Sequence, residues 1–464
     1  MAKVLLECDY DRESLNAGWK TILLNQFHDI LPGSSIQPVY NKSDEDYAEV
    51  RRIGTAVLDS ARKAIAENIK TDGGLLVFNP NPFKVSGAVE SDGEVVYVKD
   101  IPSKGYKVVT PEKVTAHFEH TDKKIETNYY IVEFADDYSI SRLYDKKNCR
   151  EVLRTGGRAN VIEAFEDYPY EYDNWELSNY YEDTRYEINN VVSTGFFDEG
   201  ERFGIIIKRT FLDSTFDQKI CFYEHDERID FVTLADWKQE HYMVKAAFDV
   251  DLNTDRAAYD IQFGAVERST HKNTSWDAAK FEVCGHKFVD MGEYGYGVSL
   301  MNDCKYGHNI KDGTMKLSLF KCGTHPDPDA DKILHSFTYS LYPHSGNYRE
   351  AGTVRKAYEL NNPLVCVQIA KQDGKLDDEY SLVSCDAENF ITETVKMAED
   401  SDAVIVRGYE CFNKRSKVKV TFGFDIGKVY ICDLMENEEA ELTVNENSVE
   451  FDVKPFEIIT LKAR

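Results

Sequence analysis

The sequence predicts a mainly β protein with a helical piece at its N-terminus. Residues 14–70 carry apolar side chains spaced three and four apart, which is the spacing of helices with one buried face. After Gly74, short β-branched and aromatic runs are separated by Gly, Asn and Asp, a pattern that favours β-sandwiches over alternating α/β structure. The 464 residues are enough for two to four domains with real cores.

The first predicted helix begins near Ser14 and ends at Leu31, because Pro32 biases the preceding residue away from helical dihedrals. Its expected buried stripe consists of Leu15, Trp19, Ile22, Leu23, Phe27 and Ile30. At about 100° per residue, His28 points away from the middle of that stripe and Asp29 lies at its edge. We therefore expect His28 to be exposed to solvent or presented to another domain. An ordinary surface or capping histidine is the alternative.

The second predicted helix begins with the acidic run 43–46, which suits a helix N-terminus, and continues to Lys70. Asp72-Gly73-Gly74 ends it. Two antiparallel helices joined by a turn suggest part of a helical bundle. Such a pair of helices buries little surface by itself. The first residues of the chain also look like the middle of a secondary-structure element rather than its beginning. We therefore expect that the chain is cut from a longer protein.

The β part divides into three expected regions after a helical region at 1–72. They are a small β region at 73–115, a large β region at 116–395 and a small C-terminal β-sandwich at 396–464. The runs that predict strands are 75–78, 95–98, 128–134, 202–207, 220–223, 229–234, 243–250, 317–320, 337–341, 403–406, 418–422, 429–432 and 456–461.

Three stretches interrupt the β pattern. Residues 165–183 mix aromatic rings with carboxylates, which suits sugar rings, although a self-packed surface loop fits as well. Residues 262–277 combine a strand with a polar loop holding one Arg and one His, and an ordinary hairpin is the favoured interpretation. Residues 325–331 form an acidic loop, for which a solvated loop is favoured over metal binding.

The net charge and the cysteine pattern restrict the expected binding partners and the expected cellular compartment. A net charge of −27 and a pI near 4.9 predict no nucleic-acid partner and no anionic membrane partner. Ten cysteines occur singly without a CxxC pair, which is typical of reduced thiols in a cytoplasmic protein. No apolar run approaches the ~20 residues of a membrane span. No GxSxG, HExxH, P-loop or Rossmann motif is present.

Residues 24–36, LNQFHDILPGSSI, closely resemble the His-Asp motif of glycoside hydrolase family 38, the α-mannosidases. The resemblance continues in the same order along the chain, at 236–248, 262–276, 297–307 and 337–344. It implies part of a three-helix bundle, followed by a β-supersandwich and small β-sandwich domains. It also implies a retaining, metal-dependent exo-α-mannosidase that hydrolyses terminal α-mannosyl residues of oligosaccharides.

The resemblance assigns roles to the His-Asp pair. His28 matches a ligand of the family's zinc ion, and Asp29 matches the adjacent catalytic-site Asp that contacts the bound sugar. In the family, the nucleophile, the acid/base and the other zinc ligands belong to an N-terminal catalytic barrel domain. That domain is missing here, so we expect this chain alone to be inactive and to hold no zinc tightly.

The family also sends residues from its β region to the active site. Arg268 is our candidate arginine, and Asp173 and Trp175 are our candidates for further sugar contacts. The expected partners are a mannose-containing oligosaccharide and the N-terminal catalytic domain, and a homo-oligomer stays open. Two other interpretations remain, a non-catalytic carbohydrate-binding β-sandwich and a purely structural module.

Overall fold

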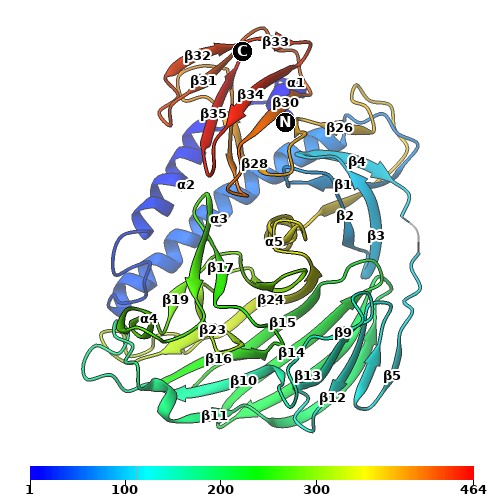
Figure 1. Cartoon of the computed structure of the whole chain (residues 1–464). Coiled ribbons are helices and arrows are strands. Elements are labelled where there is room, and N and C mark those ends of the chain that lie inside the picture. Colours follow the sequence, from blue (N-terminus) through cyan, green and yellow to red (C-terminus); the bar gives the residue numbers. More distant parts are fainter. Residues whose placement is uncertain (112) are drawn as a thin grey trace.

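Three helices open the chain in the computed structural model, which describes residues 1–111 and 113–464 (Figure 1). They are α1 (Ala2–Leu6), α2 (Arg12–Asn25) and α3 (Gln37–Ala66). The helix predicted to reach Leu31 ends at Asn25, whose buried amide donates to the Thr21 carbonyl and to the Asp46 carboxylate of α3.

The other helix boundaries also differ from the prediction. Asp11 caps α2 by accepting a hydrogen bond from the backbone N–H of Ser14, the residue predicted as the cap. The second helix begins at Gln37 rather than Ser43, because Pro38 lies in its first turn, where a proline is tolerated. It ends at Ala66, four residues before Lys70.

The predicted stripe is only partly buried, which corrects the prediction: Leu15, Ile22 and Ile30 are half-buried, and the other three members are exposed. Trp19, Leu23 and Phe27 are 60%, 62% and 58% exposed. The helix instead packs on α3 through Gly18, where an added Cβ would lie 4.0 Å from the Ile53 side chain. The small residue allows close contact between the helices and leaves the large side chains facing outward.

A four-stranded sheet and a separate hairpin follow the helices. The sheet has the order β25 (Val365–Ile369), β1 (Gly74–Asn79), β4 (Gly105–Val109) and β26 (Glu379–Ser381), and the hairpin joins β2 (Val85–Ser91) to β3 (Glu94–Ile101). Strands from far along the chain therefore complete a sheet begun by β1. The expected regions 73–115 and 116–395 share this sheet, so they are not separate units.

Two large antiparallel sheets form the body of the molecule, in the lower half of Figure 1. One runs β12 (Asn190–Asp198), β13 (Arg202–Phe211), β14 (Ser214–Tyr223), β15 (Ile229–Asp236), β24 (Leu334–Ser345), β21 (Tyr296–Asn302), β20 (Phe288–Glu293), β17 (Arg256–Ile261) and β18 (Gly264–Ser269).

The other runs β19 (Val283–Cys284), β22 (Gly307–Lys311), β23 (Thr314–Cys322), β16 (Tyr242–Asp249), β10 (Ala159–Glu166), β8 (Ile140–Asp145), β7 (Tyr130–Phe134), β6 (Lys124–Glu126) and β5 (Glu119–Thr121), with β9 (Arg150–Glu151) and β11 (Arg185–Glu187) beside this path.

The main hydrophobic core lies between these two sheets. Phe231 of the first sheet stacks on Tyr339 and meets Phe248 of the second edge to face, with ring centroids 5.0 and 5.7 Å apart. Short helices complete this region, namely η1 (Tyr181–Asp183), α4 (Ser275–Ala279) and α5 (Thr353–Asn361). The alternation of buried and exposed residues along strands such as β15 explains why a sheet can have one face in this core.

A small sandwich ends the chain, beside α1 at the top of Figure 1. Its two sheets comprise β27 (Val383–Cys385), β30 (Ser416–Phe422), β34 (Ser448–Val453) and β33 (Val444–Asn445), and β28 (Phe390–Met397), β29 (Val404–Glu410), β35 (Ile458–Ala463), β31 (Val429–Cys432) and β32 (Glu438–Leu442). The boundary expected at 395–396 falls inside β28, so the sandwich begins earlier than the sequence indicated.

The structure confirms a mainly β fold with helices near the N-terminus. Among the helices of the described residues, none combines the length and apolar character needed to cross a membrane.

Candidate functional site

The His-Asp pair lies in a tight turn just after α2. Asp29 has a left-handed backbone with φ of 69°, a conformation that costs free energy for a residue with a side chain and tolerates Asp better than most. The Ser34 hydroxyl donates to Asp29 Oδ1 at 3.0 Å, and the Tyr40 hydroxyl donates to the Asp29 carbonyl at 2.9 Å. Tyr40 also accepts from the Ser35 backbone N–H at 2.8 Å. The turn is therefore held from several sides.

His28 is presented outward from this turn. Its ring is exposed and lies 4.0 Å from the ring of Phe27, centroid to centroid. Within the described part of the chain, no hydrogen bond or ion pair engages the His28 ring nitrogens, and only one Asp29 carboxylate oxygen is engaged by a side-chain donor. The pair thus offers an imidazole nitrogen and a carboxylate oxygen to a ligand.

The acidic loop that precedes β24 lies next to the His-Asp turn. Gln37, at the start of α3, donates its side-chain N–H to Asp329 Oδ2 at 3.0 Å. Burial raises the pKa of Tyr40, and the carboxylates of Asp327, Asp29 and Asp331 reinforce that rise. Tyr40 therefore stands between the two segments and lies within the electrostatic field of both.

The aromatic loop that follows β10 joins the acidic loop through Asp173. Asp173 is 7% exposed, and its carboxylate accepts from the backbone N–H groups of Thr324 and His325 at 2.9 and 2.7 Å. It also pairs with His241 Nδ1 at 3.0 Å. Burial opposes ionisation, yet these N–H donors and His241 hold the pKa of Asp173 below its ordinary value. Asp173 therefore holds the two loops together. Its predicted contact with sugar stays a prediction.

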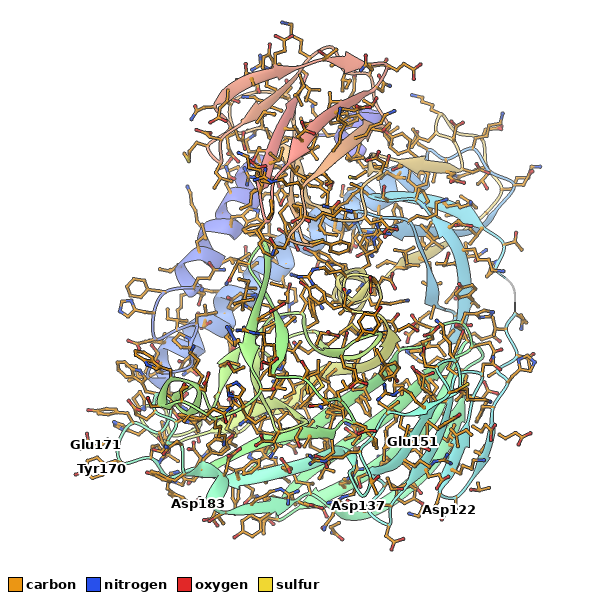
Figure 2. The ribbon with its side chains drawn as sticks, in the orientation of Figure 1. Asp122, Asp137, Glu151, Tyr170, Glu171 and Asp183 are labelled. Atoms are coloured by element: carbon orange, nitrogen blue, oxygen red, sulfur yellow. The ribbon has the colours of Figure 1, made fainter. Side chains whose placement is uncertain are left out.

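An open concavity of about 440 Å³ lies between these loops. Its lining includes Tyr168, which stacks on His241 with centroids 4.5 Å apart, and the exposed rings of Tyr170 and Tyr172. Figure 2 shows Tyr170 and Glu171 together at one edge of the molecule, far from Glu151 and Asp122. Trp175 follows in the same loop and is 68% exposed, so its ring is available to a ligand.

Buried charges hold the aromatic loop against the sheet. Lys321 of β23 pairs with Asp167 Oδ2 at 3.0 Å and donates to the Glu176 carbonyl at 2.9 Å. Burial raises the pKa of Asp167, and the positive charge of Lys321 counteracts that rise. Further along the loop, Lys245 donates to the Tyr181 hydroxyl at 3.0 Å and pairs with Glu282. The loop is exposed at its tip and fixed at both ends.

Arg268 lies in β18 and lines a different cavity, of about 290 Å³. Its guanidinium donates to the Cys284 carbonyl at 2.8 Å and covers the Tyr259 ring at 5.0 Å from its centroid. The contacts described above join the His-Asp turn to the aromatic and acidic loops, and Arg268 makes none of them. Its predicted contact with a substrate stays a prediction.

A metal ion held by this chain alone needs several converging ligands. Across residues 1–111 and 113–464, no three His, Cys, Asp or Glu side chains converge to hold one. His28 fits a single zinc ligand, but the described residues do not form a complete zinc site around it.

Several residues of this surface escaped the sequence analysis. Gln37, Tyr40, His241 and Lys321 connect the segments, yet they come from three separate parts of the chain and carry no local signal. Only Ser34 could have been found, because a hydroxyl five residues after an Asp across Pro-Gly suits a side-chain-capped turn.

Comparison with protein families places the chain among the glycoside hydrolases. Residues 1–65 match the α-mannosidase middle domain, residues 125–329 match the glycosyl hydrolases family 38 C-terminal domain, and residues 389–461 match the family 38 C-terminal β-sandwich domain. These three matches follow one another along the chain and together cover most of it. The chain belongs to glycoside hydrolase family 38, of which it carries the middle domain and the C-terminal domains.

Curated relatives match nearly the whole chain. It is 29% identical to human alpha-mannosidase 2C1 over 97% of its length, and 28% identical to alpha-mannosidase G of Dictyostelium discoideum over 97%. The alpha-mannosidase of Saccharomyces cerevisiae is 28% identical over 98%. The chain spans about half the length of these relatives, namely 46%, 48% and 44%.

Solved structures share the fold. An alpha-mannosidase from Enterococcus faecalis V583 superposes over 100% of this chain and 65% of its own, with a TM-score of 0.85 and 14% identity. A family 38 protein from Enterococcus faecalis has a TM-score of 0.83 over 100% of this chain and 67% of its own, with 15% identity.

Proposed function

We propose that the chain forms the C-terminal part of a retaining, metal-dependent exo-α-mannosidase that hydrolyses terminal α-mannosyl residues of oligosaccharides. The names of its curated relatives support an α-mannosidase. The observation that carries the proposal is the exposed, preformed His28-Asp29 turn. The hydrogen bonds from Ser34 and Tyr40 hold the Asp29 carboxylate and backbone in place before any ligand binds, which suits a binding site.

In this proposal, the residues of the turn and Trp175 of the aromatic loop each have one role. The Ser34 hydroxyl fixes the Asp29 carboxylate, which then accepts a hydrogen bond from a sugar hydroxyl through its other oxygen. His28 supplies one nitrogen ligand to a zinc ion whose remaining ligands come from outside the described residues. The exposed Trp175 ring offers an apolar face to the C–H face of a sugar.

The two reacting carboxylates of a retaining enzyme stand about 5–5.5 Å apart, one as nucleophile and one as acid/base. We assign both, together with the other zinc ligands, to a separate N-terminal catalytic domain. The exposed apolar face of α2 and the following turn suits that partner, because a contiguous apolar surface marks an interaction site. The face consists of Trp19, Leu23, Leu24, Phe27, Leu31 and Ile36.

We place the enzyme in the cytoplasm. All ten cysteines are free thiols, including four that are buried, which supports a reducing compartment.

The test combines this chain with the N-terminal catalytic domain of a family member and measures hydrolysis of an aryl α-mannoside. We expect His28→Ala to abolish turnover while the unfolding curve stays unchanged. The matched control is His120→Ala, an exposed histidine on β5, which should leave turnover unchanged. In the same assay, the chain alone should show no turnover and no stoichiometric zinc. Turnover by the chain alone would contradict the proposal.

A non-catalytic carbohydrate-binding role is the second candidate, because the open concavity beside Tyr168 combines aromatic rings with carboxylates. It predicts that the chain alone binds mannosides and that Tyr168→Ala abolishes this binding. If both occur while the combined protein shows no turnover, the second candidate replaces the first.

A further inference from the structure

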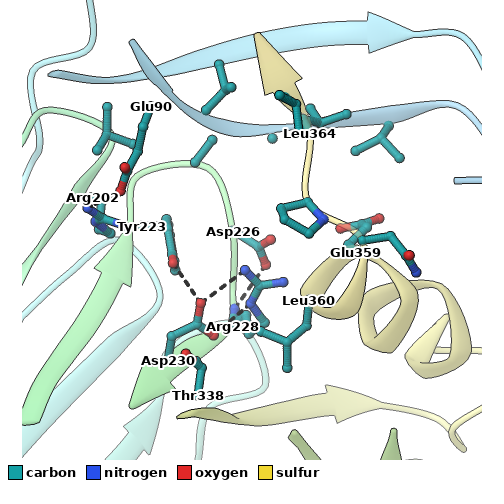
Figure 3. Close-up of a pocket in the computed structure, with 18 of the residues that line it drawn as sticks. Glu90, Arg202, Tyr223, Asp226, Arg228, Asp230, Thr338, Glu359, Leu360 and Leu364 are labelled. Atoms are coloured by element: carbon teal, nitrogen blue, oxygen red, sulfur yellow. Dashed lines mark hydrogen bonds and ion pairs between the residues drawn. The ribbon is translucent and has the colours of Figure 1, made fainter. Parts of the chain in front are cut away.

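A second cavity, of about 450 Å³, lies away from the His-Asp turn, where three parts of the fold meet. The β2–β3 hairpin forms one wall, the ends of β14 and β15 form another, and the C-terminal end of α5 with the segment after it forms the third (Figure 3). Cavities of this size at the junction of structural units are typical of small-ligand sites.

One side of the cavity is largely apolar. Val85 and Val89 of β2 face it, with Gly87 between them on the same side of the strand. A Cβ at Gly87 would have no neighbour nearer than the Val85 side chain at 4.0 Å, so the glycine leaves space open. Leu360 and Leu364 extend this surface from the other wall.

The opposite side is charged, and its charges are already paired. Arg228 holds Asp230 with two hydrogen bonds of 2.7 and 3.1 Å, and the Tyr223 hydroxyl donates to the same carboxylate at 2.7 Å. Lys356 bridges the other two carboxylates near the helix, at 2.9 Å to Asp226 and 3.2 Å to Glu359.

At the mouth of the cavity, Arg202 pairs with Glu90 at 2.8 Å. In all, four carboxylates and two guanidinium groups line the space: Glu90, Asp226, Asp230, Glu359, Arg202 and Arg228.

This balance restricts the class of ligand. An anion would face an excess of carboxylates and would have to compete for guanidinium groups that are already engaged. A cation would compete with Lys356 and Arg228 in the same way. A neutral molecule with many hydroxyl groups adds charge-assisted hydrogen bonds to carboxylate oxygens without leaving a charge unpaired. Its C–H groups would contact the valine and leucine side chains.

We propose that this cavity binds a neutral monosaccharide or disaccharide, at a site distinct from the His-Asp turn and the aromatic loop. The site recognises hydroxyl groups through Glu359 and Asp226 and the ring through the wall around Gly87. This inference goes beyond the proposed function, because it needs neither the N-terminal domain nor catalysis.

The test is a calorimetric titration of the purified chain with D-mannose, D-glucose and D-galactose, each in turn. Inorganic phosphate and spermidine serve as anionic and cationic probes. We expect saturable binding of at least one hexose and weaker or no binding of the two charged probes. Gly87→Leu should fill the cavity and weaken hexose binding by roughly tenfold or more.

Two controls and one further test variant make the result decisive. Gly195→Leu places the same side chain on the exposed strand β12, where a Cβ meets nothing within 4 Å, and should bind as the unmodified chain does. Glu359→Gln keeps the shape of the side chain and should weaken binding by roughly three- to tenfold, which tests the site even if Gly87→Leu fails to fold. Tyr168→Ala, in the other concavity, should have no effect.

The inference is overturned if no hexose saturates the chain, or if phosphate or spermidine binds more tightly than every hexose. It is equally overturned if folded Gly87→Leu and Glu359→Gln both bind as the unmodified chain does, or if Tyr168→Ala alone removes binding. None of these outcomes depends on α-mannosidase turnover, so this inference and the proposed function fail separately.

Discussion

Regular apolar patterns occur both in the helical pair and in the two large sheets, but their side chains are buried in the sheets and exposed on α2. In the sheets, rings such as Phe231 and Tyr339 are completely buried between layers. In α2 and the turn that follows it, Trp19, Leu23 and Phe27 recur with helical spacing and face outward. The two patterns are equally regular, yet only one of them has a partner surface within the described residues.

This difference shows that amphipathic periodicity identifies a face that another surface will cover. It does not show whether that surface belongs to the same chain or to another domain. The sheets cover each other, so their pattern reports the core of this chain. The face of α2 that carries Trp19 and Leu23 is free because the helix turns its Gly18 side toward α3. Such a face is the expected mark of an interface with another domain.

Matched truncations of two phenylalanines should separate the regions most clearly. Phe231→Ala creates a cavity in a filled core and should lower the free energy of unfolding by about 3–5 kcal/mol. Phe27→Ala removes an exposed ring and should change it by less than about 0.5 kcal/mol. Chemical denaturation of both variants measures the two values. Equal losses would mean that the face of α2 is buried in solution.

Removing the Asp173 carboxylate should have an intermediate effect. Asp173→Ala leaves the backbone N–H groups of Thr324 and His325 without their acceptor, which costs about 1–3 kcal/mol. The loss should be local, so hydrogen exchange should accelerate in the loops at 165–183 and 323–331. The control is Asp59→Ala on the exposed side of α3, where exchange in these loops should not change.

Acid should release the same loops in the unmodified chain. The pKa of Asp173 is lower in the folded chain than in the unfolded chain. Its stabilising contribution is therefore complete above the unfolded value and is lost as the pH falls through the folded value. Exchange rates at the Thr324 and His325 amides, corrected for intrinsic rates, should rise as the pH falls below the ordinary aspartic acid pKa of about 3.9. A flat profile in Asp173→Asn identifies this carboxyl as the cause.

Making the helical face polar should have little effect on the stability of this chain. Leu23→Ser combined with Phe27→Ser should leave the free energy of unfolding of this chain within about 1 kcal/mol. The same pair of changes should weaken association with the N-terminal catalytic domain, measured by calorimetric titration. Unchanged association together with lower stability would reverse our assignment of this face.

The sequence predicts much of the fold because its strands are short and punctuated. All the strand runs that we predicted overlap observed strands, for example 229–234 within β15. Strand β10 escaped prediction because its buried face includes Glu163, which looks like a solvent-facing residue until Arg185 and Lys316 pair with it. The end of α2 escaped because the hydrogen bonds of Asn25 reach across to Asp46, a contact that only the tertiary structure creates.

Part of the candidate site can likewise be predicted from the sequence, and part of it only from the fold. The His28-Asp29 motif is local, so the sequence reveals it, together with the helix breaker that follows. The role of Asp173 depends on N–H groups about 150 positions away along the chain. Composition identified its loop as unusual, but only the fold shows that this carboxylate organises the loop and that Tyr170 and Trp175 are its exposed members.

The sheet that joins β1 to β25 has a consequence for synthesis. Residue Phe78 pairs with Val365 across this sheet, so the strand made first finds one neighbour only after the entire body of the molecule has left the ribosome. Until then, one edge of β1 lacks its partner, with Leu76 and Phe78 still to be buried. This edge of β1 should therefore stay unpaired until β25 is made, and the sheet should close after the two large sheets, whose strands lie between β4 and β25 in the sequence.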